Sequence, residues 1–286
     1  MRLAKCLLIF LVCSLIISCS LVKTTYNNAP VLVAWWLDDY FKFTPAQNLI
    51  LKPALESLHH WHRQHQLPQY VTLLQDTQAN LASEGFNAND ACKQLDAIRL
   101  SLYTLQNESI PIIVEMAPLL SDDQLARFQK KLDERSEEWK SDWWQETKEE
   151  QLAARLEKAE DYAKKVYGNL DEAQLKLLKQ SIAEAKINPE IRYKEILRRN
   201  QDAYQILNAL KNQPLSTDEK SQLVRAGFDR IRNSPNHAYQ AHADAMSRYT
   251  CQTIADLHVS TSPQQKLHAQ NWLNDYIVLL TALQVK

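Results

Sequence analysis

The stretch FTPAQ, residues 43–47, decides the fold because it is a complete start signal for an α-helix. Thr44 supplies a side-chain oxygen that accepts a hydrogen bond from the free N–H groups of the first turn, and Gln47 reaches back to the amide of Thr44. Pro45 occupies the first helical position, where its missing N–H group costs nothing. The stretch therefore predicts a helix that begins at Pro45.

The same signal returns further along the chain. A capping oxygen with a glutamine three residues later stands in LSDDQ, LDEAQ and TSPQQ, which are residues 120–124, 170–174 and 261–265. Ser216 and Glu219 form a looser copy. Between these points apolar residues recur at intervals of three and four, and the sustained alternation typical of β-strands is absent. An all-α, multi-helix fold is therefore expected.

The periodicity also predicts where each helix lies. Helices are expected over residues 29–43, 45–65, 67–84, 88–107, 109–118, 121–166, 171–186, 189–212, 217–232, 236–258 and 263–283. No linker rich in Gly, Pro or Ser divides them, so we expect one all-helical domain over residues 29–286. Each amphipathic face needs a partner helix to cover it, and an array of antiparallel helices, which can be elongated, meets that need.

Residues 1–18 have the order of a secretory signal peptide. Arg2 and Lys5 supply a positive start, and an apolar run over residues 7–17 leads to a small residue directly before Cys19. The run is too short to cross a bilayer, which takes about 20 predominantly apolar residues. Cleavage before Cys19 is therefore expected.

The tetrapeptide IISC, residues 16–19, resembles the lipobox of bacterial lipoproteins. The resemblance implies a diacylglycerol on the Cys19 thiol and an acyl chain such as palmitate on the new amino terminus. More than one chain is needed for a stable hold on a membrane. Ser20, in place of Asp, implies sorting to the outer membrane of the cell envelope, facing the periplasm. Residues 19–28 are then the lipidated amino terminus and a tether.

The remaining cysteines form an even pair. Cys6 and Cys13 leave with the signal peptide and Cys19 takes the lipid, which leaves Cys92 and Cys251. Outside the cytoplasm, an even pair favours a disulfide. Two separate buried thiols are the alternative.

Composition and the missing motifs exclude several classes of function. The chain has 33 Lys and Arg against 34 Asp and Glu, so no basic surface for nucleic acid is expected. No nucleophile elbow, Cys-x-x-Cys pair, phosphate-binding loop or His-Glu-x-x-His motif is present. We therefore expect neither an enzyme nor a bound cofactor other than the lipid on Cys19.

Several short motifs resemble an uncharacterised family of bacterial lipoproteins, one of the domains of unknown function. The motifs are NNA at residues 27–29, WWLDDY at 35–40, TPAQ at 44–47, WHR at 61–63, LP at 67–68 with Tyr70, and GNLDEAQ at 168–174. Asp171 stands where the family pattern has Thr, a change that preserves capping chemistry. The resemblance implies a lipidated, all-helical envelope protein without an assigned activity. The Leu-Thr-x-x-Gln form also resembles the helix starts of Spy-type periplasmic chaperones.

One candidate binding surface is the motif that contains Trp35, Trp36, Asp38, Asp39 and Tyr40. Its aromatic faces suit an apolar or sugar ligand, and its carboxylates could orient that ligand. Neighbouring carboxylates on a helix point about 100° apart, which is poor geometry for one reaction centre. The alternative is a set of core aromatics with an ion-paired or exposed acidic edge.

A weaker candidate is a metal site in the histidine-rich segment. His59, His62 and His65 are spaced three residues apart and could present imidazoles on one side of a helix to zinc or copper. No further ligand on another helix is evident, and a solvated face is the alternative reading.

The residues together predict a lipid-anchored helical module. It is expected to act by noncovalent interaction with a protein or another envelope component, and to meet the membrane through its lipid. A chaperone-like protein, a metal-binding protein and an enzyme without a recognisable motif are the alternatives.

Overall fold

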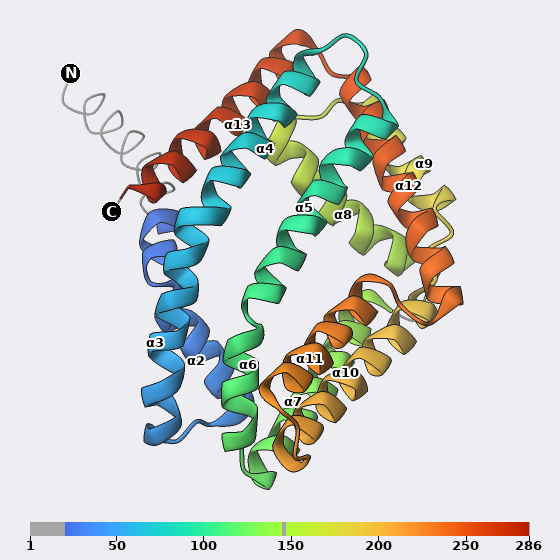
Figure 1. The fold of residues 1–286 in the computed structure, drawn as a ribbon. Helices are drawn as coiled ribbons and strands as arrows, with labels where there is room; N and C mark the ends of the chain where they lie inside the picture. The colour runs from blue at the N-terminus through green and yellow to red at the C-terminus, as the bar shows by residue number, and fades with distance from the viewer. Residues whose placement is uncertain (1–20, 145–146, 286) are drawn as a thin grey trace, which may run out of the picture.

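The computed structural model describes residues 21–144 and 147–285. The expected signal peptide, Cys19 and Ser20 lie outside these residues. Over the described ranges the chain is all-α and contains no strand, which confirms the expected fold class (Figure 1).

The regular elements alternate with short connections. In chain order they are α2 (Ala29–Phe41), α3 (Pro45–Trp61), the π-helical turn η1 (His62–Gln66), α4 (Leu67–Ala82), α5 (Ala88–Glu108), α6 (Ile110–Met116), the 3-10 turn η2 (Ala117–Leu119), α7 (Asp122–Trp143), α8 (Lys148–Tyr167), α9 (Glu172–Glu184), α10 (Pro189–Asn212), α11 (Thr217–Arg232), α12 (His237–Val259) and α13 (Pro263–Gln284). Residues 21–27, which were expected to be a tether, are helical and lead into α2.

The prediction of one long helix over residues 121–166 is wrong. Helix α7 ends at Trp143 and α8 begins at Lys148. The new start has its own capping box, in which Thr147 accepts from the backbone N–H of Glu150 and the Glu150 carboxylate accepts from the N–H of Thr147. Charged residues are frequent on both sides of this boundary, and the helical spacing of apolar residues shows no break there. The boundary is therefore hidden in the sequence pattern.

Helices α3, η1 and α4 form one continuous helical path with a wider turn in the middle. In that turn the N–H of Leu67 bonds to the carbonyl of His62, five residues back. Pro68 follows directly, lacks an N–H group, and in a regular α-helix its ring would clash with the carbonyl four residues earlier. The π-helical turn relieves this clash, which explains why two predicted helices join here.

The helices pack mainly in pairs. Helix α4 lies along α13, α5 along α12 and α7 along α10, and α6 continues from the end of α5 to pack on α11 and α3 (Figure 1). The apolar core accordingly consists of several separate clusters, each between neighbouring helices. Separate clusters are centred on Cys251, Leu273 and Phe86, on Tyr167 and Leu178, and on Tyr40, Phe41 and Leu125.

Two helix starts are clamped together by their glutamines. The Gln47 Nε2 donates to Gln124 Oε1 at 2.9 Å, and the Gln124 Nε2 donates to Gln47 Oε1 at 2.8 Å. Each amide also donates to a backbone carbonyl just before the partner's cap, that of Leu119 at 2.7 Å and that of Lys42 at 3.3 Å. The starts of α3 and α7 therefore satisfy each other's buried polar groups.

The starts of α9 and α13 repeat this arrangement. Gln174 and Gln265 exchange amide hydrogen bonds of 2.9 and 2.8 Å. They also donate to the carbonyls of Ser260 and Asn169, at 3.1 and 2.8 Å. All four predicted capping boxes with glutamine are confirmed, and each belongs to one of these two glutamine pairs. The looser copy at Ser216 and Glu219 also forms a capping box.

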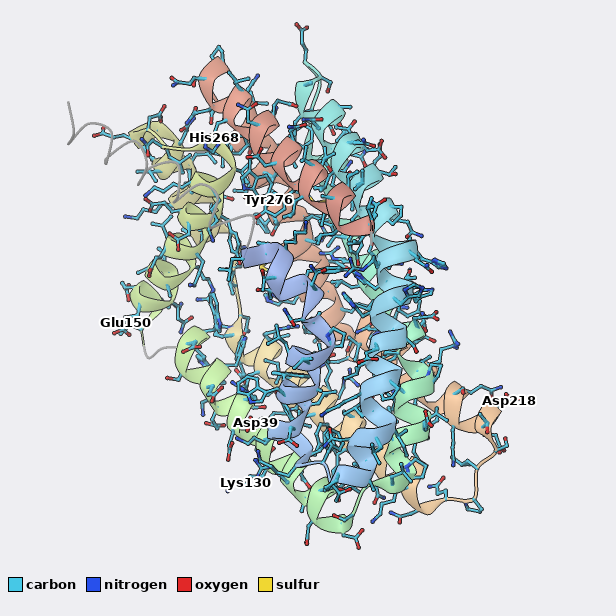
Figure 2. The ribbon with its side chains drawn as sticks, turned by 90° about the vertical axis from the view of Figure 1, so that its left-hand side faces the viewer. Asp39, Lys130, Glu150, Asp218, His268 and Tyr276 are labelled. Atoms are coloured by element: carbon cyan, nitrogen blue, oxygen red, sulfur yellow. A yellow bond between two sulfur atoms is a disulfide. The ribbon has the colours of Figure 1, made fainter. Side chains whose placement is uncertain are left out.

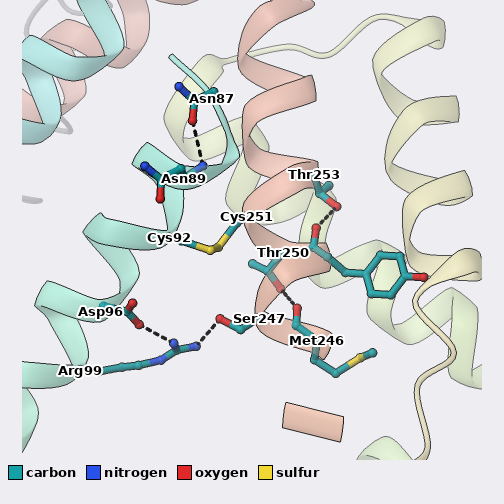
Figure 3. The surroundings of a disulfide bond; sticks show 11 residues. Asn87, Asn89, Cys92, Asp96, Arg99, Met246, Ser247, Thr250, Cys251 and Thr253 are labelled. Atoms are coloured by element: carbon teal, nitrogen blue, oxygen red, sulfur yellow. Dashed lines mark hydrogen bonds and ion pairs between the residues drawn. A yellow bond between two sulfur atoms is a disulfide. The ribbon is translucent and has the colours of Figure 1, made fainter. Parts of the chain in front are cut away.

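A disulfide joins the middle of the chain to its last third. Cys92 of α5 and Cys251 of α12 are bonded across a sequence separation of 159 (Figure 3). Cys251 is fully buried in the cluster with Leu273. Two helical turns further along α5, Arg99 donates to Asp96 at 2.8 Å and to Ser247 of α12 at 3.0 Å. The α5–α12 pair is therefore held both covalently and by polar contacts.

A buried carboxylate links α10 to the segment between α11 and α12. Glu195 accepts from Arg198 and Arg199, each at 2.8 Å, and from the Ser234 hydroxyl at 2.9 Å. Burial alone would raise the pKa of Glu195, but these three donors outweigh burial and lower the pKa to about 2. The two arginines also donate to carbonyls at the end of α11. The network therefore fixes the position of α10 against α11. The charges of Glu195, Arg198 and Arg199 are paired with one another within it.

Candidate functional site at the amino-terminal helix

An open apolar groove lies where the first described helical segment meets α2. Residues 21–27 and α2 are joined at Asn28, with Pro30 near the start of α2. The groove has a volume of about 600 Å³ and is lined by Leu21, Val22, Thr25, Tyr26, Ala29, Leu32, Val33 and Trp36. Its lining comes entirely from residues 21–36, on the outer surface of the molecule.

The exposed side of this segment is strongly apolar. Trp35 is 77% exposed and Trp36 is 50% exposed, and Leu32 and Val31 are also exposed. Between residues 21 and 37 the only charged side chain is that of Lys23. Large, contiguous, exposed apolar surface in a folded protein marks an interaction site.

The opposite side of α2 is packed against the body of the protein. Ala34 lies in a cluster with Leu51 of α3, and Tyr40 and Phe41 pack on Leu125 and the rest of the α7 cluster. Figure 2 shows α2 at the front of the molecule with Asp39 near its lower end. The apolar surface is therefore carried by a helix fixed on its inner side.

The predicted surface of Trp35, Trp36, Asp38, Asp39 and Tyr40 is divided by the structure. The tryptophans are exposed, whereas Tyr40 is buried in the core. Asp38 accepts from the backbone N–H of the residue that precedes the α3 cap and pairs with a lysine one turn later. Asp39 pairs with lysine and arginine side chains of α7, at 3.4 and 3.8 Å. The motif therefore combines two exposed tryptophans with a core tyrosine and an ion-paired acidic edge.

A buried polar junction ties the segment before α2 to both η1 and the end of α13. The Arg63 guanidinium donates to the carbonyl of Leu283 at 2.7 Å and to the Asn27 side-chain oxygen at 2.9 Å. It also lies 5.1 Å from the ring centroid of Tyr26. Arg63 is 7% exposed, and within the described ranges it forms no ion pair with a carboxylate. The Leu283 carbonyl belongs to the last turn of α13, where the partial negative charge of the helix end favours a cation.

Tyr26 and His62 complete the junction. The Tyr26 hydroxyl and His62 Nδ1 are 3.0 Å apart. Burial raises the pKa of Tyr26 to about 12, although the nearby Arg63 opposes the shift. Burial, and secondarily His59, lowers the pKa of His62. Both groups are therefore uncharged at neutral pH, which suits a hydrogen bond in a site with little water.

The histidines of the predicted metal site are used in packing. His59 packs against Tyr26 with ring centroids 4.7 Å apart, His62 bonds to Tyr26, and His65 meets Trp61 edge to face. Among residues 21–144 and 147–285, no group of three or more His, Cys, Asp or Glu side chains could hold a metal ion. The spacing of three predicted a shared side of the helix. His59 and His62 do share one, since both rings contact Tyr26, whereas His65 contacts Trp61 instead.

Gln66 lies beside this junction and is completely buried, yet neither of its amide atoms finds a hydrogen-bond partner among the described residues. A buried, unsatisfied amide costs free energy, so Gln66→Met should raise the free energy of unfolding by about 1–2 kcal/mol. Urea denaturation measures the change. Gln78→Met is the matched control, because the Gln78 amide donates to the carbonyl of Gln270 and its loss should destabilise the protein. A stability loss in Gln66→Met would contradict the prediction.

Sequence reasoning missed the role of Arg63, although it noted the motifs that contain Arg63 and Asn27. The two residues are 36 positions apart, and nothing in either motif shows that they meet. Arg63 stands in a run of His and Gln residues, HHWHRQHQ at residues 59–66, so the local sequence carried no signal that its side chain is buried.

The sequence candidate for lipidation, Cys19, falls outside the described residues, and so does the signal peptide. Within the described ranges, none of the helices has the combination of length and apolar content needed to cross a membrane.

Comparison with known proteins gives one match. A family model described as a family of unknown function, DUF6279, matches residues 39–226, which is well over half of the chain. The match begins inside α2 and ends inside α11. No curated protein and no solved structure matches the chain.

Proposed function

Because the chain belongs to DUF6279, a family of unknown function, we propose a function from its own residues: a lipid-anchored helical protein of the bacterial envelope. Cys19 carries the lipid, and the folded module acts by noncovalent contact with a protein or another envelope component, at the outer membrane facing the periplasm. One observation carries this proposal. The lipobox-like IISC ends two residues before Leu21, where the exposed apolar groove begins.

The Cys92–Cys251 disulfide supports the proposed compartment. Disulfides persist in the periplasm and other oxidising environments and are rare in the cytoplasm of mesophiles. The described part of the chain also offers no metal cluster and no arrangement of nucleophile and base at the groove, which is lined by apolar side chains. These features favour binding over catalysis as the proposed activity.

The proposal is tested at Cys19. Cells that express the chain are labelled with radioactive palmitate, and the purified protein is weighed by intact mass spectrometry. The unaltered chain should incorporate the label and begin at an acylated Cys19, because a thiol at this position is the acceptor of the diacylglycerol. Cys19→Ser should lose essentially all of the label.

Cys13→Ser is the matched control, since it changes a cysteine of the same apolar run that is not an acceptor in this proposal. It should leave both the label and the mature mass unchanged. Full labelling of Cys19→Ser, or a mature chain that begins elsewhere, would refute the lipid anchor.

A further inference from the structure

We infer that the exposed apolar face of residues 21–36 lies on the lipid bilayer itself, so that the folded module contacts the membrane directly and not only through its acyl chains. This inference rests on the proposed function, because it takes the membrane next to Cys19 as its partner. It adds a second attachment, which fixes how the module is oriented.

The position of the face selects a bilayer as its occupant. Cys19 precedes Leu21 by two residues, and two residues span at most about 7 Å in any conformation. With acyl chains on Cys19 inserted in the membrane, the first residues of the face must lie at the membrane surface. At 1.5 Å per residue, the helical path from Leu21 through the joint at Asn28 to Trp36 is about 22 Å long, so the face can extend along that surface.

The chemistry of the face suits the interfacial region of a bilayer. Indole rings such as those of Trp35 and Trp36 favour the boundary between hydrocarbon and water, and Leu32 and Val33 add aliphatic surface beside them. Lys23 is the single charge and can reach the headgroups with its flexible chain. A surface helix of this kind binds through buried apolar area.

Charged groups begin where the apolar face ends. Asp39 is paired with Lys131 and Arg127 of α7, at 3.4 and 3.8 Å. Lys130 lies on the same helix, between these two residues in the sequence (Figure 2). These groups must remain in water or among the headgroups. The contact with the bilayer is therefore limited to residues 21–36, and α7 stays outside the hydrocarbon layer.

The buried junction makes the face rigid. Arg63 holds Asn27 at 2.9 Å and the end of α13 at 2.7 Å, while Tyr26 bonds to His62 of η1. The segment that follows Cys19 is thus fixed to the body of the protein on its inner side. A fixed face loses little conformational entropy on binding, which favours attachment at a defined orientation.

The first test measures contact with lipid in the acylated protein. Purified full chain is reconstituted in vesicles of phosphatidylethanolamine and phosphatidylglycerol whose acyl chains carry bromine, which quenches tryptophan fluorescence at short range. We expect quenching that falls clearly in Trp35→Phe and Trp36→Phe. Trp272→Phe is the matched control, because Trp272 packs against the cluster of Cys251 and not in the face. Its loss should leave the amount of quenched emission unchanged.

The second test removes the acyl chains. The mature chain with Cys19→Ser is mixed with the same vesicles and separated by flotation. Partition should be measurable, should change little between low and high salt, and should fall about tenfold in Trp35→Ser, since that side chain contributes a large exposed apolar area. Thermal unfolding of Trp35→Ser should match that of the parent, because the exposed indole makes no core contact.

The outcomes separate the inference from the proposed function. Acylation of Cys19 without any quenching that depends on Trp35 or Trp36 overturns the inference and leaves the anchor standing. Flotation of the Cys19→Ser chain that depends on Trp35 supports the inference even when Cys19 proves not to be acylated. A stable dimer in which Trp35 is shielded from bromolipid and from a soluble quencher overturns the inference, because a second copy then covers the face.

Discussion

Reduction of the Cys92–Cys251 disulfide is expected to lower the free energy of unfolding by about 4–5 kcal/mol, because the bond closes a loop of 159 positions in the unfolded chain. A loss of this size is a large share of the total stability of an ordinary domain. The measurement is urea denaturation of the purified protein with and without a strong reductant. The denaturant dependence of the free energy should also steepen, because an unfolded chain without the cross-link exposes more surface.

A double variant separates the loss of the cross-link from the loss of packing. Cys92→Ala/Cys251→Ala removes two sulfur atoms from the cluster around Leu273, so it should be less stable than the reduced parent by the cost of a small cavity. Equal stability of the oxidised and reduced parent would contradict the prediction and would show that the unfolded chain gains little freedom when the bond is broken.

Helix starts could be predicted from the sequence because their chemistry is complete within four residues. Thr44, Ser121, Asp171 and Ser262 each accept from the N–H group of a glutamine three residues later, as expected. The same signal at Thr147 was overlooked, since the charged periodicity of α7 and α8 has no visible break. The start signal is therefore present in the sequence even at the boundary that the prediction missed.

The candidate site could not be predicted in the same way. Periodicity identifies which residues share a side of α2, but that helix is apolar on more than one side, so the pattern does not show which side is covered. Tyr40 packs in the core while Trp35, five residues earlier, is exposed. Likewise, Arg63 finds its acceptors on Asn27 and Leu283, which are 36 and 220 positions away. Only tertiary structure brings such groups together.

One tertiary feature does leave a trace in the sequence. Capping boxes accept either glutamine or glutamate at the third position. The boxes with glutamine form the two pairs, in which Gln47, Gln124 and Gln174 are buried and Gln265 is half-buried. The boxes closed by Glu150 and Glu219 are exposed, and their hydrogen bonds stay within the box. A carboxylate cannot donate, so it can close its own cap but cannot join a pair. The choice of glutamine thus indicates where two helix starts meet.

Gln124→Glu is therefore expected to lower the free energy of unfolding by about 3–5 kcal/mol, the usual cost of a buried charge without a partner. The substitution keeps the acceptor for the Ser121 amide but replaces the donor that bonds to Gln47 and to the carbonyl of Lys42. The position is buried, so the carboxylate would face two acceptors with little water. Urea denaturation at neutral pH measures the loss.

Glu219→Gln supplies the matched control, because it exchanges the same two side chains in an exposed capping box and should change stability by less than about 0.5 kcal/mol. The pH dependence identifies the cause. Burial should raise the pKa of a carboxyl at position 124 above its value in the unfolded chain. The penalty is then absent below the unfolded pKa, grows as the pH rises from the unfolded to the folded pKa, and is complete above the folded one. The deficit of Gln124→Glu should accordingly shrink in acid, where the protonated group donates to Gln47 again. A deficit that is independent of pH would point to altered packing and would contradict the role given to the glutamine pair.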